Sequence, residues 1–135
     1  MSLSRQFAAF VAALDCEKLP AEVVDRAKGV TLQALTSALL AQEMAPSKHA
    51  LAMMQEEEAG GAGVATVLGK GVKLTKSGAA FVNSEMILAG GKWDTFRMLT
   101  HPGSAIVPAA LAAAEITRCS GKQFIEGLVA GYEVM

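Results

Sequence analysis

The apolar residues of this chain recur mostly at spacings of three and four, which predicts a succession of helices. Between Leu3 and Leu14 they form one stripe, made of Phe7, Phe10, Val11 and Leu14. A second helix is expected from Pro20 to about Gln42, because proline is favoured at the first helical position. We expect its apolar positions to be buried, namely Val23, Val24, Ala27, Val30, Leu35 and Leu39.

The middle of the chain combines helix signals with a glycine-rich stretch. Ser47 is expected to cap a third helix that passes through Met54 and ends at the glycines near residue 60. Around residues 60–76, valine and threonine lie between glycines, which predicts a short extended segment or hairpin. A fourth helix is expected over residues 79–88.

The last third of the chain predicts two more helices, each preceded by a serine. Ser104 is expected to cap a helix that runs to about Arg118. Ser120 and Gln123 have the spacing of a capping box, in which each side chain binds the other residue's backbone N–H. The helix after Ser120 is apolar up to Met135 and carries no stop signal. We therefore expect a missing remainder or a partner.

The composition supports a mainly α fold, a helical bundle with one short extended segment around residues 60–76. Hydrophobic residues make up 52% of the 135 residues and aromatic residues only 5%. The core must therefore be built from alanine, leucine, valine and methionine. Because many of these side chains are small, the helices can approach one another closely. The length is that of a single domain.

Charge and cysteine content narrow the function classes. A net charge of −1 gives no basic surface for nucleic acid or for an anionic membrane. Two cysteines are too few for a disulfide framework and are expected to be reduced thiols. No export signal and no run of about 18 apolar residues is found. We expect a cytoplasmic protein that binds neither nucleic acid nor membranes.

A polar loop between the fourth and fifth helices holds the candidate chemistry. His101 is one of two histidines, and a neutral imidazole can accept a proton near neutral pH. Asp94 could orient this imidazole, and Thr95 or Thr100 could bind a substrate oxygen. In the alternative reading, the segment from His101 to Ser104 is only a turn before a helix, in which His101 and Asp94 satisfy backbone groups. The histidines and cysteines have no metal-ligand spacing, so no metal site is expected.

Four passages, in order, resemble the N-terminal part of the MmgE/PrpD family, which includes 2-methylcitrate dehydratase and cis-aconitate decarboxylase. The passages are LPAEVV at 19–24 with AK at 27–28, GAAFVN at 78–83, THPGS at 100–104 with PAALA at 108–112 and Glu115, and SGK at 120–122 with GYEV at 131–134. Together they span nearly the whole chain.

The resemblance implies cofactor-free lyase or isomerase chemistry on small di- and tricarboxylates. It also implies a large helical domain and a smaller α+β domain with the active site between them, usually in a dimer. The family's Asp-Thr pair matches Asp94 and Thr95, and its catalytic histidine matches His101. We take these three residues as the candidate catalytic group, and Thr100 and Lys92 as candidate substrate-binding residues. No cofactor and no metal is implied.

The same loop departs from the family pattern at several positions. The family's leading histidine falls on Leu88, its first aspartate on Gly91, its phenylalanine on Lys92 and its next aspartate on Trp93. Gly91 therefore removes a carboxylate of the family's active site. The family's later site residues and second domain lie outside these 135 residues, so we expect residues 1–135 to be a single partial helical domain.

Three hypotheses follow. The first is a truncated or split lyase, inactive alone, which would bind a small carboxylate substrate only within a homo-oligomer or together with a complementary chain. The second is a non-catalytic helical module for self-association or interaction, derived from the same family. The third is a small enzyme of altered chemistry, in which His101 is the acid/base and a second copy of the chain completes the pocket.

Overall fold

The computed structural model describes residues 2–97 and 100–135, and within these ranges the chain is mainly α-helical, as the sequence predicts. One short antiparallel hairpin lies in the predicted extended segment. The elements are α1 (Leu3–Ala12), a 3-10 turn η1 (Cys16–Lys18), α2 (Ala21–Ala41), α3 (Ala45–Glu57), β1 (Ala65–Val67), β2 (Val72–Leu74), α4 (Lys76–Ala89), α5 (Gly103–Thr117) and α6 (Gly121–Val134).

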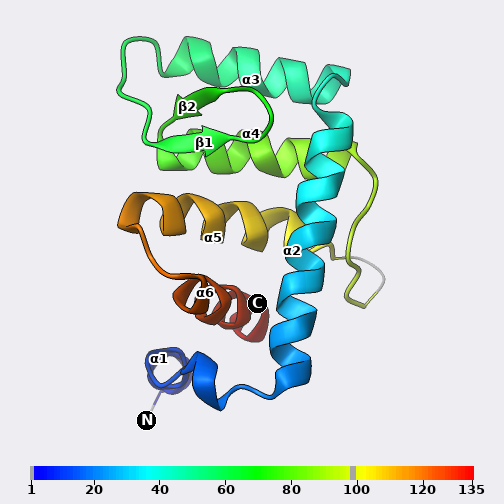
Figure 1. Cartoon of the computed structure of the whole chain (residues 1–135). Helices are drawn as coiled ribbons and strands as arrows, with labels where there is room; N and C mark the ends of the chain where they lie inside the picture. Colours follow the sequence, from blue (N-terminus) through cyan, green and yellow to red (C-terminus); the bar gives the residue numbers. More distant parts are fainter. Residues whose placement is uncertain (1, 98–99) are drawn as a thin grey trace.

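The long helix α2 runs along one side of the molecule, and the other helices are stacked across it (Figure 1). The order of the stack is α3, α4, α5 and α6, with α1 beyond α6. The central helix α4 packs against α2, α3 and α5, and the hairpin rests on it. Within the described ranges, no helix has both the length and the apolar character needed to cross a membrane.

The core consists largely of small side chains, as the composition predicts. The face of α2 that packs against the stack presents Ala34, Ser37, Ala38 and Ala41, all of which are buried. The prediction that Leu39 is buried is wrong, since 48% of its surface is exposed. Close crossing of α4 and α5 over α2 requires small residues at the contact, so the larger side chains of α2 turn outward or lie at the edge of the core.

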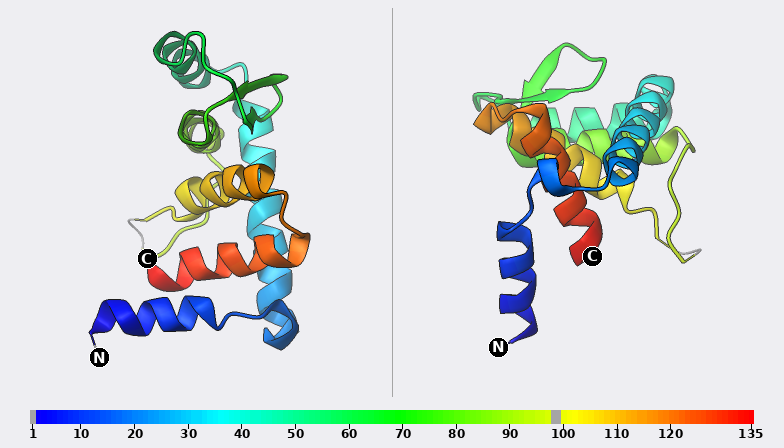
Figure 2. Two further views of the ribbon diagram at one scale, coloured as in Figure 1. Left: turned by 90° about the vertical axis from the view of Figure 1, so that its left-hand side faces the viewer. Right: turned by 60° about the horizontal axis from the view of Figure 1, so that its bottom comes forward.

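Helix α1 has the predicted apolar stripe, but none of its residues is buried. Phe7 is 38% exposed and Phe10 is 43% exposed. The two views of Figure 2 show α1 extending beside α6, at the end of the stack. The amphipathic pattern therefore predicts this helix correctly, although within the described residues 2–97 and 100–135 its apolar face remains exposed.

Of the three predicted serine caps, only Ser120 is confirmed. Ser120 and Gln123 form the capping box at the start of α6. The cap predicted at Ser47 is wrong because α3 begins earlier, with Pro46 in its first turn, where the missing N–H leaves no bond unmade. The cap predicted at Ser104 is also wrong. Helix α5 begins at Gly103, and the Ser104 hydroxyl instead donates to the His101 carbonyl at 2.7 Å.

Two side chains fasten the hairpin to the helices. The buried Asn83 of α4 accepts from the Leu68 N–H at 2.9 Å and donates to the Thr66 carbonyl at 3.0 Å. Glu115 of α5 accepts from both the N–H and the hydroxyl of Thr66, and it also accepts from the Lys73 ammonium. The lysine first and the threonine hydroxyl second lower the pKa of Glu115 to about 2.

Glu115 should make the stability of this fold depend on acid pH. Its folded pKa lies below its ordinary value of 4.5, so its stabilising effect is present above pH 4.5 and is lost as the pH falls toward 2. Solvent screens this partly exposed pair, and we expect a contribution of about 1–2 kcal/mol. In chemical denaturation measured between pH 2 and 6, Glu115→Gln should lose this part of the pH dependence. Asp25→Asn, which changes an exposed carboxylate, is the control and should follow the wild type. Parallel curves for Glu115→Gln and the wild type would contradict the assignment.

Candidate functional site

The loop between α4 and α5 is fastened at its start to the long helix α2. The buried Ser37 hydroxyl donates to the Ile87 carbonyl at 2.8 Å and accepts from the Lys92 N–H at 3.2 Å. Between these contacts Gly91 has φ +68°, a left-handed conformation that suits glycine at the end of a helix. The loop therefore leaves α4 in a direction set by the buried Ser37.

The first aromatic residue of the loop, Trp93, lies against His101. The indole N–H donates to the Leu88 carbonyl at 2.9 Å, and so satisfies a carbonyl in the last turn of α4. The centroids of the Trp93 and His101 rings are 4.5 Å apart, with an interplanar angle of 45°. At this separation the indole face can attract a cationic imidazolium. His101 is thus held from one side by a ring whose own position is fixed.

The backbone of Asp94 defines the tautomer of His101. The Nδ1 atom of His101 lies 2.9 Å from the Asp94 carbonyl oxygen. A carbonyl can only accept, so Nδ1 carries the hydrogen, and in the neutral ring Nε2 keeps its lone pair. The Thr95 hydroxyl lies 3.4 Å from the same Nδ1, a longer and weaker contact. The half-buried imidazole therefore has one nitrogen occupied by the protein and one left for another molecule.

The carboxylate of Asp94 binds the helices α5 and α6, whereas its carbonyl binds His101. Both of its oxygens lie 3.0 Å from the Gly103 N–H, the first N–H of α5, where a negative charge is favoured by the helix dipole. The Tyr132 hydroxyl of α6 donates to the same carboxylate at 2.6 Å. A Cβ at position 103 would lie 2.7 Å from that hydroxyl and 2.8 Å from an Asp94 oxygen, so a larger residue would have to displace both side chains. Asp94 thus joins the loop, α5 and α6.

The surroundings of the half-buried Tyr132 hydroxyl raise its pKa above the ordinary value. Burial is the main cause that raises its pKa, and the hydrogen bond to the Asp94 carboxylate raises it further. The neutral phenol is therefore the form that fits the folded protein, and it acts as a donor to Asp94.

The structure brings the three candidate catalytic residues together. His101, Asp94 and Thr95 are in mutual contact, although Asp94 orients the imidazole through its backbone carbonyl and not through its carboxylate. The candidate substrate-binding residues are less closely joined to His101. Thr100 is exposed and its backbone pairs with that of Phe96 at 2.8 and 3.2 Å. The Lys92 side chain is exposed and lines a shallow groove along α2.

Sequence reasoning missed two residues of this site. Tyr132 contacts Asp94 across a separation of 38 residues, and only its position in the GYEV passage marked it. Ser37 lies inside α2, where a serine carries no sequence signal of its own.

The loop has further groups that bear on its chemistry. The guanidinium of Arg97 lies 5.0 Å from the centroid of the Phe96 ring, which places a cation on the same loop as His101. Among residues 2–97 and 100–135, no three histidine, cysteine, aspartate or glutamate side chains are grouped so that they could hold a metal ion. The arrangement can orient a histidine, accept a proton at Nε2 and bring positive charge near an anionic ligand.

Comparison with known proteins identifies one family. The family described as the MmgE/PrpD N-terminal domain matches residues 5–135. No curated protein and no solved structure matches the chain.

Proposed function

This chain belongs to the MmgE/PrpD family, and on that premise we propose that it supplies one wall of a lyase active site for small di- or tricarboxylates. His101 acts in this site as the general acid/base, and the reaction uses no cofactor. The remaining groups come from polypeptide outside residues 1–135 or from another chain. Catalysis of this kind requires several groups to be held together around the reacting carbon, so the 135 residues alone are expected to be inactive.

The observation that carries the proposal is the fixed tautomer of His101. Its Nδ1–H is held by the Asp94 carbonyl, and its ring is held by Trp93. A histidine that only filled a turn would not need both restraints. A base, in contrast, gains from a fixed ring because its free nitrogen must point at one substrate hydrogen.

The proposed step is a proton transfer at a carbon next to a carboxylate. Nε2 of His101 takes the proton, and the electron pair of the broken C–H bond forms a carbon–carbon double bond. In a dehydration, hydroxide leaves from the adjacent carbon and departs with a proton as water. The imidazolium that forms is stabilised by the Asp94 carbonyl at Nδ1 and by the Trp93 ring.

We further propose that the substrate's carboxylates are bound by exposed polar and cationic groups of the loop. Thr100 offers a hydroxyl, Arg97 a guanidinium and Lys92 an ammonium. Arginine pairs with a carboxylate through two parallel hydrogen bonds. Both cysteines are free, which fits a reducing cytoplasmic location.

Carboxylate binding can be measured directly, because Trp93 is the single tryptophan and contacts His101. We expect cis-aconitate and citrate to change the Trp93 fluorescence of the native particle in a saturable manner, and the uncharged trimethyl ester of citrate to have no effect. Arg97→Gln should weaken binding about tenfold, since one charged hydrogen-bonding group is lost. Arg26→Gln, which removes an exposed guanidinium on α2, is the matched control. An unchanged emission spectrum at millimolar tricarboxylate would contradict the proposal.

The second candidate function is a non-catalytic helical module that self-associates. Leu88 and Gly91 favour it, because neither position offers an ionisable side chain where the family pattern has histidine and aspartate. At Gly91 the left-handed backbone (φ +68°) itself disfavours a residue with a side chain, so the carboxylate is absent from a position that suits glycine. This candidate predicts a stable homo-oligomer that binds no carboxylate in the same fluorescence titration.

A further inference from the structure

Helix α6 is connected to the imidazole of His101 through Asp94. The Tyr132 hydroxyl of α6 donates to the Asp94 carboxylate at 2.6 Å. The carbonyl of the same Asp94 accepts from Nδ1 of His101 at 2.9 Å. Tyr132 therefore reaches the proposed acid/base through two hydrogen bonds, with Asp94 between them.

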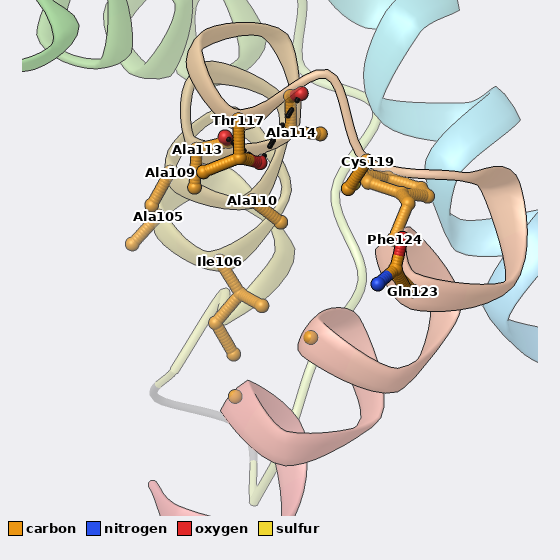
Figure 3. Close-up of a pocket in the computed structure, with 12 residues that line it drawn as sticks. Ala105, Ile106, Ala109, Ala110, Ala113, Ala114, Thr117, Cys119, Gln123 and Phe124 are labelled. Atoms are coloured by element: carbon orange, nitrogen blue, oxygen red, sulfur yellow. Dashed lines mark hydrogen bonds between the residues drawn. The ribbon is translucent and has the colours of Figure 1, made fainter. Parts of the chain in front are cut away.

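The position of Tyr132 is set by the packing of α6. Its ring packs against the hydrophobic core. One residue earlier, a Cβ at Gly131 would lie only 2.6 Å from the γ2 methyl of Ile106. The Ile106 side chain points from α5 toward α6 in the apolar hollow between these helices (Figure 3). The two helices therefore approach closely where Tyr132 leaves α6, and a rigidly packed element presents its hydroxyl to Asp94.

The orientation of Asp94 depends on this hydroxyl. Among the described residues, the other donor to the Asp94 carboxylate is the Gly103 N–H, which lies 3.0 Å from both oxygens. One N–H shared between two oxygens restricts the rotation of a carboxylate only weakly, whereas the Tyr132 hydroxyl at 2.6 Å holds one oxygen in a defined place. The side chain and the carbonyl of Asp94 are joined to the same Cα. A fixed carboxylate therefore also limits the directions in which the carbonyl can point.

The backbone of His101 is fixed separately from Tyr132. The His101 carbonyl accepts from the Ser104 N–H at 3.1 Å and from the Ser104 hydroxyl at 2.7 Å, both in the first turn of α5. The imidazole is thus attached to α5, while the carbonyl that orients it is attached to α6 through Tyr132. Loss of the tyrosine hydroxyl should therefore release the Asp94 carbonyl and leave the His101 backbone in place.

We propose that Tyr132 is a positioning residue for the acid/base, because its hydroxyl aims the Asp94 carbonyl at Nδ1 of His101 and so keeps Nε2 free for the substrate. This inference rests on the proposed function of His101. The hydroxyl donates a hydrogen bond throughout and transfers no proton. Its neutral form in the folded protein agrees with this role, since burial first and the Asp94 carboxylate second raise the pKa of Tyr132. Tyr132 then affects the reaction only through the orientation of the base.

Nitrogen-15 magnetic resonance of the histidine rings in the native particle tests the positioning role without any turnover. The chain has two histidines, so His49→Ala identifies the signals of His101. At about pH 8.5, where imidazole is neutral, the wild type should show Nδ1 protonated and Nε2 unprotonated. Tyr132→Phe, which keeps the aromatic ring, should lower the ratio of the Nδ1–H to the Nε2–H tautomer about fivefold, as expected for the loss of one hydrogen bond. Thr31→Val removes a hydroxyl that donates within α2, so it is the matched control and should leave the ratio unchanged.

A second variant disturbs the same contact from α5. The methyl group of Gly103→Ala would meet both the Tyr132 hydroxyl and the Asp94 carboxylate, so it should displace them and lower the tautomer ratio as well. Gly127→Ala, on α6, is the matched control, because a Cβ there would meet open space.

Steady-state turnover by the native particle shows whether the restraint matters for the reaction. Tyr132→Phe should lower kcat about tenfold and leave KM within about twofold of the wild type, because it misorients the base without changing carboxylate binding. A tautomer ratio that is unchanged in both Tyr132→Phe and Gly103→Ala would overturn the proposal, as would a wild-type kcat for Tyr132→Phe in an active particle. If the ratio falls but the wild-type particle is inactive, the restraint of His101 by Tyr132 is upheld and the lyase function is contradicted.

Discussion

Replacing His101 with alanine should lower kcat of the native enzyme by about 100- to 10,000-fold, the range expected when a general acid/base is removed. The loss should fall on kcat, because the imidazole acts on the reacting carbon and not on the carboxylates that anchor the substrate. The measurement is steady-state turnover of cis-aconitate and 2-methylcitrate by the particle purified with all of its associated chains. The fold should survive the change, since His101 is only half-buried.

The second histidine provides the control for this experiment. His49 lies on the exposed face of α3, so His49→Ala removes an imidazole without touching the loop. Its kcat should equal that of the wild type. If His101→Ala kept wild-type turnover while the native enzyme was active, the assignment of the acid/base would be wrong.

Replacing Asp94 with alanine should lower the free energy of unfolding by about 2–3 kcal/mol. The change removes a charged acceptor, and it leaves the Gly103 N–H and the partly buried Tyr132 hydroxyl without their partner. Chemical denaturation at pH 7 measures this loss. Asp25→Ala, on the exposed surface of α2, should change the free energy of unfolding by less than about 0.5 kcal/mol.

A double-mutant cycle with Asp94→Ala and Tyr132→Phe separates the tyrosine's share of the lost free energy of unfolding, and we expect a coupling of about 1 kcal/mol.

Tyr132 is the single tyrosine, so the ultraviolet absorbance of the protein also reports the pKa of Tyr132. In Asp94→Asn this pKa should fall but stay above the ordinary value of 10, because burial is the larger cause of the increase. Since the folded pKa is raised, the stabilising effect is complete below pH 10 and is lost at higher pH. An unchanged pKa in Asp94→Asn would show that the contact with Asp94 is unimportant.

Much of the fold could be predicted because local signals agree with the tertiary arrangement. The spacing of three and four in α1 and the capping box at Ser120 depend only on neighbouring residues. The glycines around the hairpin are likewise a local signal. These elements appear where the sequence predicts them, with boundaries that differ by a few residues.

The errors arise where a partner distant in sequence decides the outcome. Helical spacing predicts that Leu39 is buried, but the closely crossing helices pack against the alanine face of α2 instead. Ser104 follows a turn and resembles a cap, yet the Asp94 carboxylate satisfies the first N–H of α5 from nine residues away. The residues of one helix alone therefore do not predict which distant side chain will bind its first N–H.

In the candidate site too, the sequence predicts which residues share a loop but not which contacts they make. The sequence places Asp94, Thr95 and His101 on one loop, and their contacts in the structure agree with that grouping. It does not show that Asp94 uses its carbonyl for His101 and its carboxylate for α5 and α6. It also gives no sign of Ser37, because a buried serine in a helix looks the same as an exposed one.

The central claim is that His101 moves a proton at a carbon next to a carboxylate, and solvent exchange tests this most directly. Proton nuclear magnetic resonance can follow the replacement of a substrate C–H hydrogen by deuterium when the native particle is incubated with 2-methylcitrate in D₂O. We predict exchange with the wild type and with His49→Ala, and none above background with His101→Ala. Exchange at the wild-type rate in His101→Ala, or no exchange and no turnover by the wild-type particle, would contradict the claim.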